Sequence, residues 1–98
     1  MTLDDILDQL NKRKQRATYG AVAGILGVSP QGVMGGRQPS HRDSWVVAAK
    51  TDSKRMSRRG WPTGYKDEEI HPECLRKIHH NPGDFIKDAA KLKQLLNS

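Results

Sequence analysis

Ninety-eight residues suit one small domain that spans residues 1–98, and a second domain is not expected. The mean hydropathy of -0.78 and the lack of a long apolar run exclude a membrane-spanning chain. The single cysteine excludes an internal disulfide, and residues 1–15 lack the apolar core of a signal peptide, so we expect a cytoplasmic protein.

The formal net charge of +6 is unevenly distributed along the chain. Residues 1–11 carry three Asp and no base, whereas residues 12–59 carry eleven Lys and Arg against only two Asp. This asymmetry favours a polyanionic partner such as double-stranded DNA, because clustered cations neutralise phosphates and release counterions. The alternative is an ordinary solvated basic face.

Residues 3–13 are predicted to form a first helix. Thr2 and Asp5 have the spacing of a helix start, and the apolar side chains fall on one face: Leu3, Ile6, Leu7 and Leu10. The cations at positions 12, 13 and 14 suit the negative end of the helix dipole, so they need no ligand to explain them.

Residues 16–37 contain six glycines and still carry a helical spacing of apolar residues. Thr18 can cap a second helix, which Gly27 would end in a left-handed turn. Ser29 and Pro30 then predict a short third helix, which the glycine pair at 35 and 36 would end. The side chains expected to face the core are Tyr19, Val22, Ala23, Leu26, Val33 and Met34.

The small Ala23, the turn glycine Gly27 and the branched Val33 have the spacing of a helix-turn-helix. Two helices that cross over a three-residue turn leave no room for a large side chain at the contact. Any tight helical hairpin accepts similar residues, which is the alternative interpretation.

Residues 44–51 and 60–65 are rich in strand formers and predict two short strands. The segment between them carries four bases, and Lys50 adds a fifth, against one acid. We expect a β-hairpin with a flexible basic tip over 52–59, the wing of a winged helix, whose cations reach phosphates or a minor groove. A loop that is only solvated is the alternative.

The sequence of the C-terminal third predicts two helices, of which the first is interrupted and the second has a clear amphipathic pattern. Three acids from Asp67 to Glu69 suit a first turn, and Asn81-Pro82-Gly83 interrupts the chain. From Asp84 onward, one amphipathic helix is predicted to carry Phe85, Ile86, Ala89, Leu92 and Leu96. This helix is expected to cover the core, with a homodimer contact as the alternative, so monomer and homodimer both stay open.

The expected fold class is α+β, mostly α: a small winged helix-turn-helix with a short β-hairpin wing and a C-terminal helix. His71, Cys74, His79 and His80 lack the paired spacing of a zinc site, so we expect no metal and no other cofactor. No glycine-rich phosphate loop follows a strand and no nucleophile turn is evident, so no enzymatic activity is expected.

The segment RATYGAVAGILG resembles the ATYGxVAxxxG opening of the DNA-binding domain shared by O6-alkylguanine-DNA alkyltransferases and the catalytically inactive alkyltransferase-like proteins. The resemblance covers residues 6–47 and implies a winged helix-turn-helix that flips a damaged guanine out of the duplex. It also implies that Tyr19 contacts the backbone of the lesion, and a core aromatic is the alternative.

In that family a PCHRV segment supplies the alkyl-accepting cysteine, and Pro39-Ser40-His41-Arg42 is similar, with Ser40 in its place. A serine hydroxyl is a much weaker nucleophile than a thiolate, so alkyl transfer is not expected. The stretch before Pro39 is shorter than in the family, and Ser44-Trp45-Val46-Val47 is the alternative counterpart. Gly32 stands where the family has the arginine that replaces the flipped base, which makes lesion recognition the second hypothesis.

The leading hypothesis is a non-catalytic DNA-binding protein, such as a transcription regulator. Ser29 and Gln31 would meet base edges or phosphates, while arginines and the wing hold the backbone. The expected DNA contacts are Tyr19, Ser29, Gln31, Gly32, Arg37, Ser40, His41, Arg42, Lys50, Lys54, Arg55, Arg58 and Arg59. A third hypothesis is a protein-interaction or inhibitor module whose basic face meets an acidic protein surface.

Overall fold

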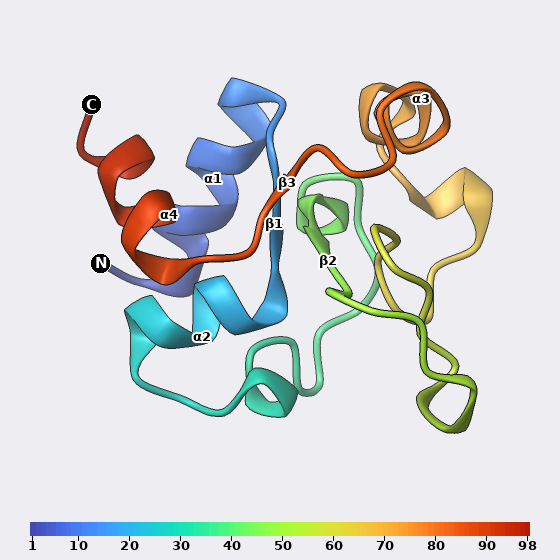
Figure 1. Cartoon of the computed structure of the whole chain (residues 1–98), viewed down its shortest axis with the longest axis horizontal. Helices are drawn as coiled ribbons and strands as arrows, with labels where there is room; N and C mark the ends of the chain where they lie inside the picture. Colours follow the sequence, from blue (N-terminus) through green and yellow to red (C-terminus); the bar gives the residue numbers. More distant parts are fainter.

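Three short parallel strands lie at the centre of the fold, with four α-helices around them (Figure 1). The computed structural model describes residues 1–98. The helices are α1 (Leu3–Arg13), α2 (Tyr19–Leu26), α3 (Pro72–His80) and α4 (Ala89–Leu96), and the strands are β1 (Arg16–Thr18), β2 (Val46–Val47) and β3 (Phe85–Ile86). The predicted α+β class is confirmed.

Strand β1 is central, and the order across the sheet is β2-β1-β3. Ala17 pairs with Val46 on one side and with Ile86 on the other, both in parallel register. All three residues of β1 are buried, because helices cover the sheet as they usually do when strands are parallel. In Figure 1, α1, α2 and α4 lie on one side of the strands and α3 lies on the other.

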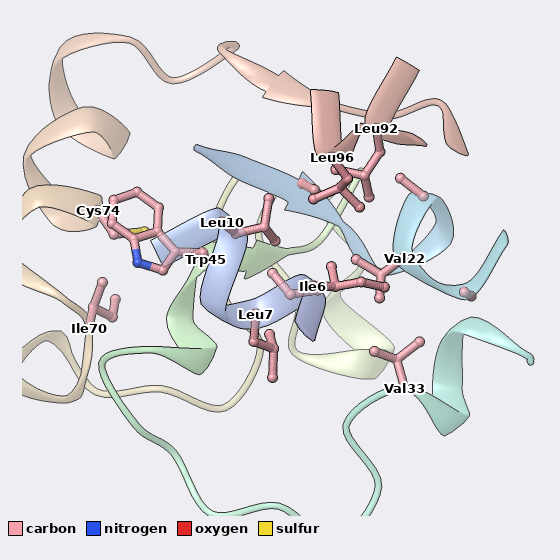
Figure 2. Close-up of a cluster of buried hydrophobic side chains, with 14 of the residues drawn as sticks. Ile6, Leu7, Leu10, Val22, Val33, Trp45, Ile70, Cys74, Leu92 and Leu96 are labelled. Atoms are coloured by element: carbon pink, nitrogen blue, oxygen red, sulfur yellow. The ribbon is translucent and has the colours of Figure 1, made fainter. Parts of the chain in front are cut away.

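The core joins side chains from every one of these helices (Figure 2). Trp45 is fully buried, and its indole Nε1 donates a 2.9 Å hydrogen bond to Asn11 Oδ1 of α1. The apolar side chains with no exposed surface are Ile6, Leu7, Leu10, Ala17, Val22, Trp45, Val46, Val47, Cys74 and Leu92. No helix combines the length and the hydrophobicity needed to cross a bilayer.

The two N-terminal helices begin where the sequence predicts. Thr2 and Asp5 form a reciprocal capping box on α1, and the Thr18 hydroxyl accepts a hydrogen bond from the Ala21 N–H at the start of α2. Gly27 ends α2 with a left-handed φ of 72°. Both helix predictions are confirmed.

The predicted third helix is wrong: residues Pro30–Gly32 form a single 3-10 turn instead. Ser29 stands at the cap position, but its hydroxyl makes no capping hydrogen bond. Val33 is the one fully buried anchor of this segment, and glycines at 32, 35 and 36 oppose an isolated helical turn. The segment predicted to form a helix-turn-helix therefore contains one α-helix where two were predicted.

The predicted hairpin of two strands is also wrong. Val46–Val47 pairs in parallel with β1, so these buried strand formers make an edge strand of the parallel sheet. Residues 60–65 form no strand, and a parallel bridge joins Ala48 to Arg59. Only the tip is hairpin-like, because Asp52 and Ser57 form an antiparallel bridge.

The final helix begins five residues later than predicted. Asp88 caps α4 by accepting a hydrogen bond from the Ala90 N–H. Phe85 and Ile86 are extended and pair with β1, which a helix would prevent. Leu92 and Leu96 are buried, so the prediction that this helix covers the core is confirmed.

A buried arginine ties the central strand to three distant segments. The Arg16 side chain is 1% exposed, and its guanidinium donates hydrogen bonds to the carbonyl oxygens of Gly60 (2.8 Å), Asn81 and Asp84 (3.2 Å). Its Nε–H has no acceptor, and burial lowers the pKa of Arg16. No carboxylate forms an ion pair with this cation, so carbonyl dipoles provide its main compensation.

Gly60 is required at this contact. Its φ is 84°, and a Cβ there would lie 3.0 Å from the Pro82 oxygen and 3.1 Å from Arg16 Nη1. Both the left-handed backbone and the close approach therefore exclude a larger residue.

Helices α2 and α4 approach each other at a second glycine. A Cβ on Gly24 would lie 2.7 Å from Ala89 Cβ, shorter than real side chains tolerate. By contrast, a Cβ on Gly20 would meet only Thr18 Oγ1 at 3.9 Å. Gly24 therefore allows the close approach of α2 and α4, whereas Gly20 has space for a side chain.

We expect Arg16→Leu to destabilise the fold by about 1–3 kcal/mol, since the buried Gly60 carbonyl would be left without its donor. Arg16→Lys should lose less, because an ammonium keeps the charge but cannot span three carbonyls. Urea unfolding followed by circular dichroism measures both. Arg76→Leu, which removes an exposed ion pair to Glu73, is the control and should change stability by less than about 1 kcal/mol. Equal losses for Arg16→Leu and the control would contradict the role given to Arg16.

We expect Gly24→Ala to lower the thermal stability, because forcing an extra methyl against Ala89 costs about 1–3 kcal/mol, more than the roughly 1 kcal/mol gained in helix propensity. Gly20→Ala has room for its methyl and should be neutral or stabilising by up to about 1 kcal/mol. Differential scanning calorimetry of the pair tests the close approach. A stabilised Gly24→Ala variant would show that α2 and α4 are not in this contact.

Candidate nucleic-acid interface

A groove of about 670 Å³ lies between the start of α2, the turn that follows it and the basic loop 50–59. Tyr19 and Gly20 contribute one wall, and Gln31 and Met34 contribute the next. The remaining lining residues are Pro30, Gly35, Ala48, Ala49, Lys50, Asp52, Arg55, Ser57 and Thr63. The groove therefore joins the predicted helix-turn-helix segment to the predicted wing.

Tyr19 is both a wall of this groove and an anchor for the loop beyond it. Its hydroxyl accepts a 2.9 Å hydrogen bond from the Thr63 N–H, and its half-buried ring packs against the core. Thr18, the cap of α2, fixes the backbone immediately before Tyr19. The ring thus packs as the core-aromatic alternative predicts and also lines the groove, while its contact with a lesion stays a prediction.

The basic loop has a closed tip. Asp52 and Ser57 exchange two main-chain hydrogen bonds of 3.0 Å, and the Asp52 carboxylate accepts a hydrogen bond from the Lys54 N–H at 3.0 Å. The Ser57 hydroxyl donates to the Lys50 carbonyl at 3.3 Å. These bonds hold Lys54 and Arg55 in a short 3-10 turn, Ser53–Arg55, that projects at the lower right of Figure 1.

The loop directs its cations to two sides. Lys50 and Arg55 line the groove, and Arg55 is 3.9 Å from the Asp52 carboxylate. Arg58 instead lies 4.0 Å from the Trp61 ring centroid, and Arg59 lies 5.0 Å from that of Phe85. The predicted basic surface is therefore split between the groove and the side near β3.

Two other residues predicted to contact DNA, Arg37 and Arg42, form ion pairs with aspartates. Arg37 pairs with Asp43 at 2.8 Å and with Asp4 at 3.2 Å, and Arg42 pairs with Asp4 at 2.7 Å and with Asp8 at 3.0 Å. The hydrogen bond from Arg42 lowers the pKa of Asp4, and Asp43 raises the pKa of Arg37. The acidic N-terminal helix thus neutralises part of the basic segment.

The other predicted contacts lie outside the groove. Ser29 and Gly32 flank it on the turn, where a Cβ on Gly32 would meet the Ser29 hydroxyl at 3.4 Å. Ser40 Oγ accepts a hydrogen bond from the Asp43 N–H, and His41 Nε2 lies 3.3 Å from the Glu68 carbonyl oxygen. Ser40 does not line the groove, whereas Ala48 and Ala49, which follow β2 directly, do.

The four residues weighed as metal ligands have separate environments. His71 Nδ1 accepts a hydrogen bond from the Glu73 N–H at the start of α3, and burial lowers the pKa of His71. The Cys74 thiol is buried, which raises its pKa to about 11, and it contacts the Ser44 carbonyl oxygen at 3.4 Å. His79 packs edge-on against Trp61, and no group of three possible ligands gathers to hold a metal ion.

Sequence reasoning missed Met34, the two alanines after β2, Ser57 and Thr63 as groove residues. Met34 was assigned to the core, and it does pack there while it lines the groove. The others carry no sequence signal for a site, because only the path of β2 and the loop brings them to Tyr19.

Comparisons with protein-family models, with curated proteins and with solved structures found no match for this chain.

Proposed function

We propose that this chain is a non-catalytic protein that binds double-stranded DNA through the groove beside Tyr19 and the basic loop 50–59. The supporting observation is that the groove combines two cations, Lys50 and Arg55, and one acid, Asp52, with the polar side chain of Gln31 and exposed glycine backbone. Such a surface suits a sugar-phosphate chain, which needs cations for its phosphates and open backbone for close approach.

In this proposal α2 and the turn after Gly27 stand where a helix-turn-helix has its two helices, and the loop stands where a winged helix has its wing. Gln31 lies on the turn and is the side chain best placed to reach a base edge. With a three-residue turn in place of a recognition helix, few base contacts are available, so we expect weak sequence preference.

Arginines 37 and 42 contribute less to this proposal than the loop does. Their guanidinium groups already have aspartate partners, so a phosphate would have to replace a carboxylate to bind them. Lys50 and Lys54 form no ion pair, Arg55 has only a long contact of 3.9 Å with Asp52, and Arg58 stacks on an aromatic ring that leaves its charge unneutralised. The loop is therefore the segment to test first.

We expect the double change Lys50→Ala and Arg55→Ala to weaken duplex binding and to reduce the slope of log K against log salt by about 1.8, since each lost phosphate contact removes about 0.9. Fluorescence anisotropy with a labelled duplex between about 50 and 200 mM salt measures both quantities. Lys91→Ala with Lys93→Ala, two exposed lysines on α4, is the control of equal charge and should leave the slope unchanged.

Equal effects of the two double changes would show that only net charge matters and would contradict the assignment to the loop. Failure of the unchanged protein to bind any duplex at low salt would contradict DNA binding altogether. That result would favour the protein-interaction module, whose basic face would meet an acidic protein.

The second candidate is a sensor of alkylated guanine, and the volume of the groove favours it. At about 670 Å³ with Tyr19 and Met34 in its wall, the groove falls within the usual range of ligand pockets, about 300–1,000 Å³. A base that has left the duplex needs a pocket of this kind. The missing arginine at Gly32 keeps this candidate second.

Binding to two otherwise identical duplexes, one with O6-methylguanine and one with guanine, separates the candidates. For the leading proposal we expect the two affinities to agree within about tenfold, equivalent to about 1.4 kcal/mol. A larger preference for the alkylated duplex would overturn the leading proposal in favour of the sensor.

A further inference from the structure

Met56 is an apolar side chain displayed at the most basic part of the molecule. It is 84% exposed, compared with 62% for Met1 and 48% for Val28, the other large exposed hydrophobic residues. Burial of a methionine side chain is normally favourable, so a partner that covered Met56 would gain binding free energy.

The backbone holds Met56 in that position. Its φ of 54° is left-handed, a conformation that residues with a Cβ seldom adopt. The Met56 N–H donates to the Ser53 carbonyl at 3.3 Å, and the paired bonds between Asp52 and Ser57 close the tip immediately around it. Met56 therefore projects from a closed turn rather than folding back onto the core.

The charges around Met56 define what can cover it. Lys54 and Arg55 precede it and Arg58 follows it, while Arg55 and Ser57 also line the groove. Cations next to an apolar tip match a surface that has phosphates beside an apolar layer. In duplex DNA that layer is the stack of base pairs.

We propose that Met56 is a wedge that inserts between two adjacent base pairs of a duplex, while Lys54 and Arg55 hold the flanking phosphates. This inference rests on the proposed DNA binding and specifies how the loop engages its ligand. Methionine suits the task because its unbranched, polarisable chain can enter a narrow gap between stacked rings. Insertion unstacks the step and bends the duplex, most easily at pyrimidine–purine steps.

The test uses a short duplex with a TA step, 2-aminopurine beside it and a donor–acceptor dye pair on its ends. With the unchanged protein we expect 2-aminopurine fluorescence to rise as the step unstacks and energy transfer to rise as the ends approach. Met56→Ala should abolish both signals and weaken binding about tenfold. The slope of log K against log salt should stay unchanged, because methionine contacts no phosphate.

Three further variants make the result specific. Met56→Leu keeps an apolar wedge and should retain both signals. Met56→Gly accepts the left-handed backbone, so it removes the wedge without loss of thermal stability. Val28→Ala removes another exposed apolar side chain away from the tip and should behave as the unchanged protein.

The outcomes separate this inference from the function on which it rests. Absence of duplex binding by the unchanged protein would overturn both. Normal binding with the same fluorescence and bending in Met56→Ala and Met56→Gly would overturn the wedge and leave DNA binding intact. Binding to phosphatidylserine vesicles that requires Met56, with no 2-aminopurine response, would overturn the wedge in favour of membrane insertion.

Discussion

The arrangement of this protein depends on one buried cation. The Arg16 guanidinium lies in the interior without a carboxylate partner, and three main-chain carbonyls compensate it. Those carbonyls belong to the end of the basic loop, the end of α3 and the approach to β3. Because a buried charge without hydrogen bonds is strongly unfavourable, these segments are held at the central strand. The groove wall formed by the loop is positioned through the same contact at Gly60.

Local signals predicted the two N-terminal helices, and tertiary contacts decided the rest. Thr2 and Thr18 mark their helices because a cap acts within three residues. The strands contain two or three residues each, too few for any periodicity, and they exist only because β1 pairs on both of its edges. The helix predicted from Asp84 onward begins only after its cap Asp88, because Phe85 is extended and pairs with Arg16.

Of the residues predicted to contact DNA, the structure brings Tyr19, Gln31, Lys50 and Arg55 to one groove. The ion pairs of Arg37 and Arg42 with Asp4 and Asp8 could not be predicted from the sequence, because these partners are separated by more than thirty residues in the chain. The net charge of residues 12–59 therefore overstates the basic surface, because it leaves out the aspartates of α1 that pair with Arg37 and Arg42.

The strand order bears on how the chain reaches its native state. The neighbours of β1 lie about 30 and about 70 residues away along the chain, so two long loops must close before the sheet exists. Until β3 arrives, Arg16 lacks the carbonyl of Asp84. Partly assembled forms would therefore hold a desolvated charge, which disfavours stable intermediates and favours a single cooperative folding step.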